Sequence, residues 1–431
     1  MSSSTDSPTG FAVDLARPAP SRGLARGLLT RWARWPLRRL VGRLLEGVQC
    51  GSISVELPNG QRLEARGAAP GPQAAIVLHR WRAMAQLALQ GDLGLAQAYR
   101  DGHWSSPDLV ALLEFGSRNE AAWGGALEGS GPARWLARLT HLRRANTRSR
   151  SRDNIAFHYD LGNAFYAQWL DPSMLYSSAL YASGDESLEQ AQAARLQRIL
   201  ELMDTPAGAR VLEIGCGWGA LATELAQRHG AHVTGLTLSS EQLAHANARG
   251  QSLGVQSQLD LRLQDYRDVQ GEYDRVVSIE MIEAVGEDYW PGYFATLRRS
   301  LRGGGTAVLQ AITIEEAYFD RYRRGADFIQ RHIFPGGMLP TVQAMREHAA
   351  REGLVLQQDL GFGMSYARTL AEWRSRFLAA WPRIAAQGFD ERFRRLWEYY
   401  LCYCEAGFRS GRVNVGLYSL RHAGPADQPA Q

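Results

Sequence analysis

The sequence predicts an α/β protein with a doubly wound, mostly parallel sheet and a smaller N-terminal α+β domain. Its 431 residues are enough for at least two domains of ordinary size. From residue 187 onward, short apolar strands alternate with amphipathic helices, which is the pattern of a parallel sheet covered by helices on both faces. Residues 51–66 instead show the alternation and the turn residues of an antiparallel hairpin.

The front of the chain contains segments of different composition. Residues 1–21 are rich in Ser, Pro and Ala, and we expect a disordered tail there. Residues 22–130 form the predicted N-terminal domain. Its first part, residues 22–48, places apolar residues at helical spacing with arginines opposite them. This pattern is typical of a basic amphipathic helix that lies on an anionic membrane, and the alternative is an ordinary surface helix packed on its own domain.

Positive charge is concentrated in the first third of the chain. Residues 1–152 contain 21 Arg against 11 Asp and Glu, a net charge of +10 in a chain whose total is +4. This asymmetry predicts an anionic partner, either phospholipid headgroups or nucleic acid. Residues 131–152 are predicted to form a basic linker between the two domains.

Cysteine content and hydropathy set further limits. The four cysteines have the spacing of neither a zinc site nor a disulfide framework, so we expect no metal site and a reduced, cytoplasmic setting. No run of apolar residues approaches the length of about 18 that a membrane-spanning helix needs.

A second domain is predicted over residues 153–420, followed by a tail at residues 421–431. It begins its regular alternation with an amphipathic helix at residues 187–203. The predicted strands occupy residues 210–214, 232–237, 261–264, 275–278 and 307–311, and two further helices occupy residues 221–228 and 241–249. Since helices separate the consecutive strands, we expect the strands to run parallel in one sheet.

The segment VLEIGCGWGALA is the strongest local motif. Gly215, Gly217 and Ala220 match the dinucleotide fingerprint G-x-G-x-x-G/A, so a dehydrogenase has to be considered. That fingerprint requires an acidic residue about 20 positions further on, but Thr237 stands there. The acidic residue instead precedes the glycines, at Glu213. This order resembles motif I of class I S-adenosylmethionine (SAM) methyltransferases, which implies a Rossmann-like fold.

The loop chemistry suits that ligand. Glycines allow the backbone to approach the methionine part of SAM closely, and the N-terminus of the following helix helps to hold its carboxylate. Asp265 and Tyr266, at the end of a later strand, are expected to flank the adenine.

Several further stretches occur in order over residues 155–413, among them IAFHYDLGNAFYAQWLDPSMLYSSALY, VSIEMIEAVGEDYWPGYF, DFIQRHIFPGGMLPT and YYLCYCEAGFRSG. Together they resemble the family of cyclopropane-fatty-acyl-phospholipid synthases and mycolic acid cyclopropane synthases. Residues 90–114 also resemble the N-terminal domain of its phospholipid-acting members. The resemblance implies that residues 153–420 are a SAM-dependent methyltransferase domain and that residues 22–130 are a lipid- and membrane-associated domain. It also implies a peripheral protein on the inner face of the membrane and a homodimer.

The reaction of that family suits an apolar, aromatic-rich site. The resemblance implies transfer of a one-carbon unit from SAM to the cis double bond of unsaturated acyl chains in membrane phospholipids. Methyl transfer leaves a carbocation, and loss of a proton from the added methyl group closes a cyclopropane ring. The alternative is a different fate of the same cation, which leaves a methyl-branched or methylene-bearing chain. Either outcome needs a base and exclusion of water.

The resemblance also implies a catalytic cluster. In the family a bicarbonate ion is thought to act as the base within a small polar site. Matched by motif, its glutamate is Glu283, its tyrosine is Tyr366, and Ile312 contributes through its backbone. The family's cysteine matches Ser178 and its histidine matches Gln310. These two departures are the reason to consider the alternative product, while ring closure stays the leading expectation. Both side chains donate hydrogen bonds, but glutamine cannot carry a positive charge.

The remaining implied site residues bind the cofactor or lie near it. A family cysteine regarded as an active-site residue matches Cys404, for which a buried structural thiol is the alternative. Glu213 is a candidate cofactor contact that organises the glycine loop. The implied SAM contacts are Tyr176, Ser177, Gly215, Gly217, Thr237, Gln242, Asp265 and Tyr266.

Other functional classes fit the sequence less well. A non-catalytic membrane-surface protein that binds SAM is compatible with the basic segment and the altered cluster. A nucleic-acid methyltransferase would show a base-flipping catalytic motif, which is absent from the sequence, so we expect no nucleic-acid partner. A serine hydrolase would need a G-x-S-x-G elbow, which is also absent.

Overall fold

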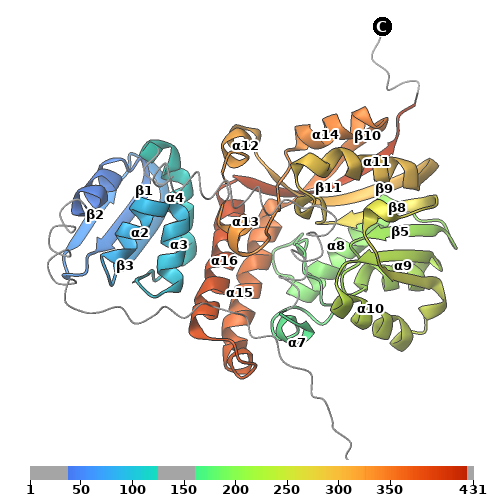
Figure 1. The fold of residues 1–431 in the computed structure, drawn as a ribbon, viewed down its shortest axis with the longest axis horizontal. Coiled ribbons are helices and arrows are strands. Elements are labelled where there is room, and N and C mark those ends of the chain that lie inside the picture. Colours follow the sequence, from blue (N-terminus) through green and yellow to red (C-terminus); the bar gives the residue numbers. More distant parts are fainter. Residues whose placement is uncertain (1–36, 125–160, 326, 425–431) are drawn as a thin grey trace, which may run out of the picture.

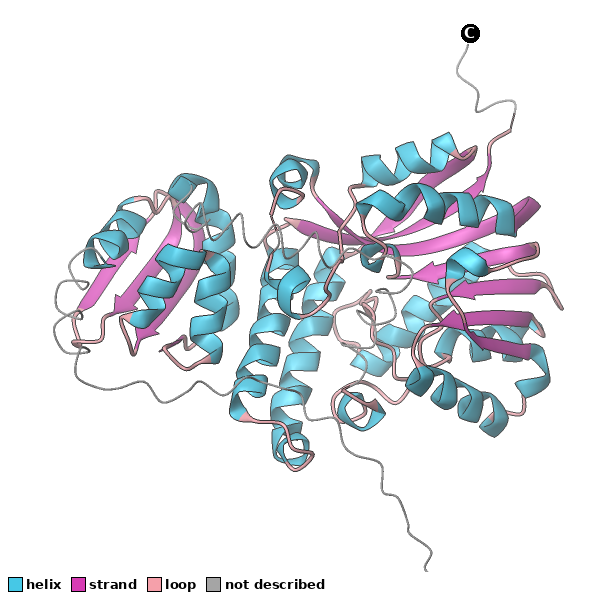
Figure 2. Cartoon of the chain, viewed as in Figure 1, coloured by secondary structure: helices cyan, strands magenta, loops and turns pink. Residues whose placement is uncertain are grey.

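The computed structural model describes residues 37–124, 161–325 and 327–424 (Figure 1). A four-stranded sheet of order β2-β1-β3-β4 lies in the N-terminal part, and a seven-stranded sheet of order β10-β11-β9-β8-β5-β6-β7 lies in the remainder. Figure 2 shows the two sheets in magenta on either side of a pair of long helices. Within these ranges, no helix combines the length and the apolarity that crossing a bilayer requires.

The N-terminal sheet forms the expected smaller α+β unit. Its strands are β1 (Cys50–Glu56), β2 (Arg62–Arg66), β3 (Ala69–Leu78) and β4 (Trp104–Ser105), and its helices are α2 (Arg82–Gln90), α3 (Asp92–Arg100) and α4 (Leu109–Trp123). β1 and β2 pair antiparallel with Glu56 opposite Arg62, so the predicted hairpin is confirmed. β1 also pairs with β3 in parallel, a pairing that the hairpin pattern does not reveal.

Residues 37–46 are helical and lie against this unit. Val41 is buried, and Trp123 donates a hydrogen bond from its indole nitrogen to the Leu44 carbonyl at 2.8 Å. The other apolar residues of this face pack against the same core: Leu37, Leu40, Leu44, Leu45 and Val48. The described part of the amphipathic segment therefore packs on its own domain. Residues 22–36, the tail at 1–21, the linker at 131–152 and residues 425–431 lie outside the described residues.

The large sheet confirms the predicted doubly wound, mostly parallel fold. Its strands are β5 (Arg210–Ile214), β6 (His232–Thr237), β7 (Leu259–Leu263), β8 (Tyr273–Ile279), β9 (Leu301–Ile314), β10 (Leu354–Gly361) and β11 (Val413–His422). β5 pairs in parallel with both β6 and β8, while β11 runs antiparallel between β9 and β10. The strand order reverses at β5, so its carboxyl end is the expected ligand position. β11 extends to His422, two residues beyond the predicted boundary of the domain.

Shorter helices accompany these strands. They are α7 (Asn163–Tyr166), α8 (Leu188–Met203), α9 (Ala220–His229), α10 (Ser240–Ser252), α11 (Trp290–Ser300), α12 (Glu316–Tyr322), α13 (Phe328–His332) and α14 (Val342–Arg351). The three that the sequence pattern predicts are confirmed as α8, α9 and α10. Ser187 and Gln190 form a capping box at the start of α8, which fixes where that helix begins.

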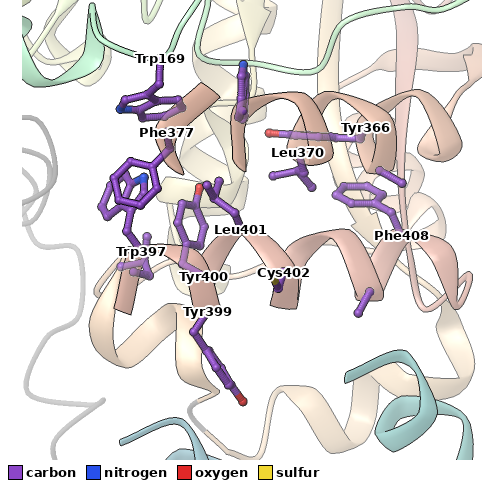
Figure 3. Close-up of a cluster of buried hydrophobic side chains, with 14 of the residues drawn as sticks. Trp169, Tyr366, Leu370, Phe377, Trp397, Tyr399, Tyr400, Leu401, Cys402 and Phe408 are labelled. Atoms are coloured by element: carbon purple, nitrogen blue, oxygen red, sulfur yellow. The ribbon is translucent and has the colours of Figure 1, made fainter. Parts of the chain in front are cut away.

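Two long helices, α15 (Gly363–Ala385) and α16 (Glu391–Arg409), lie between the two sheets (Figure 1). Tyr366 of α15 and Phe408 of α16 stack with ring centroids 4.5 Å apart, and Figure 3 shows them facing each other. Tyr399 points away from α15, and its ring lies 5.6 Å from that of Tyr99. Arg395 donates to the carbonyls of Tyr99 and Trp104. The α15–α16 pair thus joins the N-terminal unit to the large sheet.

Candidate active site

A cavity of about 870 Å³ lies at the carboxyl ends of the parallel strands. Its walls include the glycine loop after β5 and the residues that follow β6, β7 and β8. It continues past α16 to apolar side chains of the N-terminal unit, such as Leu45 and Leu87. The edge of the sheet at which the strand order reverses is the usual ligand position in this architecture.

The glycine loop adopts the backbone conformation that its sequence predicts. Gly215, Gly217 and Gly219 have φ values of 86°, 51° and 81°, in the region that disfavours other residues. A Cβ on Gly217 would have no protein atom within 4 Å, so this part of the loop leaves space beside the backbone. A Cβ on Gly219 would lie 2.8 Å from Ala246, so this glycine allows α9 and α10 to pack. The loop therefore fits a ligand such as SAM that approaches its backbone.

Most of the predicted cofactor residues line the cavity, and these are Tyr176, Ser177, Glu213, Gly215, Gly217, Thr237, Gln242 and Tyr266. Thr237 donates to Gln242 at 2.8 Å, which holds the end of β6 against the start of α10. Asp265 is different: its carboxylate is bound by Arg267, and it is not among the cavity-lining residues. Its predicted contact with adenine stays a prediction.

Four donors converge on one carboxylate, that of Glu280. Oε1 accepts hydrogen bonds from Ser177 Oγ at 2.8 Å, from the Ser178 amide at 3.1 Å and from Gln310 Nε2 at 2.6 Å. Oε2 accepts from the Tyr366 hydroxyl at 2.7 Å. The structure therefore brings Ser178, Gln310 and Tyr366 together, as the resemblance implies, but around a glutamate that was not predicted.

Glu280 has an unusual backbone conformation. Its φ is 49°, a left-handed value that is uncommon for residues other than glycine and costs about 1–3 kcal/mol. Its amide donates to the Gln310 carbonyl at 2.8 Å, directly after the last residue of β8. A left-handed backbone at a residue other than glycine, at the carboxyl end of a central strand, makes Glu280 a candidate functional residue. Glu280 stands in the segment SIEMIEAVG, but matching this segment to the family motif selects Glu283 instead.

Glu283 lies beside this cluster but belongs to a separate pair. Its carboxyl accepts the amide of Ile312, the backbone contact that the resemblance implies. Burial raises the pKa of Glu283 to about 8, and the neighbouring charge of Glu280 acts in the same direction. Its Oε2 has no hydrogen-bond partner among the described residues. Glu283 is therefore mainly protonated near neutral pH and does not serve as the ionised base.

Two expectations for the cluster need correction. The Ser178 hydroxyl donates to the Ala179 carbonyl at 2.9 Å, so this residue contributes its amide and not its side chain. The donors expected to hold bicarbonate are bound instead to the carboxylates of Glu280 and Glu283. A separate bicarbonate ion would face these acidic groups, so the residues present do not fit it.

Cys404 lines the cavity from α16. Burial raises the pKa of its thiol, and nearby acidic groups act in the same direction. A thiol in this environment stays protonated and is a poor nucleophile, which supports a structural role. The same wall of the cavity contains Tyr400, whose hydroxyl lies 2.7 Å from that of Tyr176.

Comparisons with known proteins agree with this geometry. Residues 146–417 match the family model described as mycolic acid cyclopropane synthetase. The chain belongs to this family. It is 39% identical over 376 residues to "Tuberculostearic acid methyltransferase UfaA1" of Mycobacterium tuberculosis, covering 84% of this chain and 86% of that protein. It is 36% identical over 330 residues to "Cyclopropane-fatty-acyl-phospholipid synthase" of Escherichia coli K12, covering 76% and 82%.

A solved structure supports the assignment of the family. Mycolic acid cyclopropane synthase CmaA1, complexed with SAH and CTAB, is 28% identical, with a TM-score of 0.58 over 62% of this chain and 97% of that chain. The predicted class I SAM methyltransferase fold is thereby confirmed, and with it the prediction of SAM as cosubstrate. As a member of the family, the protein is a SAM-dependent enzyme that modifies lipid acyl chains.

Proposed function

We propose that the protein transfers the methyl group of SAM to a cis double bond in an acyl chain of a membrane phospholipid and that Glu280 accepts the released proton. The convergence of four donors on Glu280 carries this proposal. A carboxylate that is fixed by the chain itself and held by groups that the resemblance assigns to the bicarbonate site supports Glu280 as the base. The apolar cavity, which continues to the N-terminal unit, suits an acyl substrate.

The proposed reaction is balanced without a further reactant. SAM supplies an electrophilic methyl group, and the electrons of its S–C bond remain on sulfur. The alkene π electrons form the new C–C bond and leave a cation on the chain. One C–H bond of the added methyl group then breaks, and its proton goes to Glu280. Oε1 already accepts three hydrogen bonds and Oε2 accepts one, so Oε2 is the oxygen that takes the proton.

We favour a methylene-bearing product. If the proton leaves at once, the C–H electrons close a cyclopropane ring. If a hydride first moves between the two former alkene carbons, the cation becomes tertiary, and loss of a proton from the methyl group gives a methylene branch (C=CH₂) on the chain. Glu280 is held by four hydrogen bonds and cannot follow the methyl group as a free ion could, which gives time for the hydride shift. The name of the relative from M. tuberculosis, a methyltransferase of tuberculostearic acid, also describes methyl transfer.

Ring closure is the second candidate. The relative from E. coli supports it, because that protein is named a cyclopropane-fatty-acyl-phospholipid synthase. A saturated methyl branch would require a reductant in a later step. For both candidate functions, we propose that the protein attaches to the inner face of an anionic membrane and acts as a homodimer.

The test is product analysis with the purified full chain, deuteromethyl SAM and vesicles of dioleoyl phospholipid. Mass spectrometry and NMR of the fatty esters distinguish the outcomes. The expected product has a methylene branch (C=CD₂) and has lost one deuteron of the transferred methyl group. Cyclopropane resonances alone would establish the second candidate. Binding of SAM without any modified acyl chain would overturn both and favour a non-catalytic protein.

A further inference from the structure

A buried arginine lies behind the Glu280 cluster. Arg195, on α8, is 1% exposed. Its Nη1 donates to Gln310 Oε1 at 3.3 Å and its Nε donates to Gln192 Oε1 at 3.2 Å, while Nη2 has no hydrogen-bond partner among the described residues. A buried guanidinium is costly unless a negative charge compensates it, so the position of Arg195 calls for a compensating charge nearby.

Arg195 determines which way the Gln310 amide points. Gln310 Nε2 donates to Ser177 Oγ at 2.9 Å and to Glu280 at 2.6 Å, and its Oε1 faces Arg195. A flipped amide would place its oxygen against the Glu280 carboxylate and its NH₂ group against the guanidinium. With Arg195 in place, only one orientation satisfies both ends of the amide.

Arg195 is a positive charge that attracts the Glu280 carboxylate. The other titratable groups that act on Arg195 or on the Glu280 cluster are Asp171, which follows α7, Glu213 of β5, Glu283 after β8 and Tyr366 of α15. Burial raises the pKa of both Glu213 and Glu283 to about 8, so both are mainly neutral at pH 7. Burial lowers the pKa of Arg195 and the charge of Glu280 opposes this, but an arginine keeps its proton in proteins.

From this geometry we infer that Arg195 is a positioning residue that acts through Gln310 to orient the Glu280 carboxylate and to place a positive charge behind it. The Arg195–Gln310 pair supplies the positive charge and the hydrogen-bond donor that a single histidine would combine at position 310. The inference rests on the proposed function, because it assumes that Glu280 is the base. It explains how a neutral glutamine serves in a site that must stabilise an anion.

The test compares R195M, which removes the charge, with the control R198Q on the same helix. Arg198 is partly exposed and pairs with Glu201 at 3.2 Å, away from the cluster. Initial rates with SAM and dioleoyl phospholipid vesicles are measured from pH 6 to pH 9.5. At pH 7 we expect R195M to lose activity by about 100-fold, with little change in the KM for SAM. Its acid limb should move to higher pH by at least about one unit, so that activity partly recovers in alkali.

A second variant keeps the inference testable if R195M does not fold. Q310M breaks the link between Arg195 and Glu280 but leaves the guanidinium in place, and we expect the same alkaline shift. The double variant R195M/Q310H restores a charge-bearing side chain and should recover part of the activity at pH 7. A loss of activity that is equal at every pH, or no loss in R195M, would overturn the inference. Failure of the wild-type chain to alkylate lipid would instead overturn the proposed function.

Discussion

Tyr366 and Glu280 join two distant parts of the chain at the candidate active site. Tyr366 lies near the start of α15, and Glu280 directly follows the last residue of β8. The Tyr366 hydroxyl donates to Glu280 Oε2 at 2.7 Å. Phe408 of α16 stacks on the Tyr366 ring and fixes its position (Figure 3). The helix pair that separates the two sheets thus also orients the carboxylate oxygen that we propose as the proton acceptor.

Tyr366→Phe should lower kcat by about 10- to 100-fold with little change in the KM for SAM, because it removes one hydrogen bond to Glu280 and leaves the stacked ring in place. Initial-rate kinetics with lipid vesicles measure this effect. Tyr273→Phe is the matched control, since Tyr273 is a buried tyrosine of β8 whose hydroxyl faces the Gln270 carbonyl. Equal losses in both variants would contradict a specific role for the Tyr366 hydroxyl.

Glu280→Gly should abolish most of the activity, by about 100-fold or more, because it removes the proposed base. Four donors would then surround an empty anion-sized space, so added bicarbonate should restore part of the rate. The backbone should tolerate glycine, because φ at this position is 49°. Thermal unfolding checks that the variant stays folded.

Wild-type protein provides the control for this rescue. Its activity should be insensitive to bicarbonate, with sodium chloride used to match ionic strength. A requirement for bicarbonate in the wild type, or full activity of Glu280→Gly without it, would show that Glu280 is not the base.

The sequence predicts those parts of the structure that depend on a local residue pattern. Strands β5 and β6 occur at the predicted residues because an apolar run bounded by turns has few other ways to be buried. The glycine loop also follows from the sequence, since its three positive φ values require glycine. β9 is much longer than predicted, because its glycine-rich residues 303–305 read as a turn. In the structure Leu301 already pairs with Tyr273, the register shifts across these glycines, and pairing resumes at Thr306.

The missed part of the site depends on tertiary contacts. Arg195 lies in a helix with several other charged residues, and only the packing of α8 against the large sheet buries it. Glu280 and Glu283 are three residues apart, and motif matching selects the second of them. Only the strained backbone at Glu280 turns its carboxylate toward Ser177, Gln310 and Tyr366. In the sequence alone, neither Arg195 nor Glu280 differs from the charged residues that ordinarily lie on a protein surface.

Removal of residues 1–36 should weaken binding to anionic vesicles without unfolding the N-terminal unit. The described helix over residues 37–46 packs its apolar face on its own domain, so it has no free apolar face to insert. The contact we propose is therefore electrostatic, and removal of residues 1–36 takes away the arginines that precede the helix, while its exposed Arg38, Arg39 and Arg43 remain. Each arginine near an anionic surface contributes about 1 kcal/mol. Sedimentation with phosphatidylglycerol vesicles at low and high salt measures the effect, and phosphatidylcholine vesicles are the control. Unchanged sedimentation with anionic vesicles would rule out this membrane contact.

Glu213→Gln should change the pH dependence of stability. Burial raises the pKa of Glu213 to about 8, above its ordinary value of 4.5. Between these values the unfolded chain is ionised while the folded chain keeps its proton, so this group lowers the free energy of unfolding as pH rises, by at most about 1.4 kcal/mol per pH unit. Glutamine does not titrate. The midpoint of thermal unfolding of the variant, relative to wild type, should therefore rise from pH 5 to pH 8 and then level off.

Glu201→Gln, on the exposed side of α8, should show no such rise. A constant difference across this range would mean that Glu213 is already ionised in the folded protein, with Arg195 as its partner.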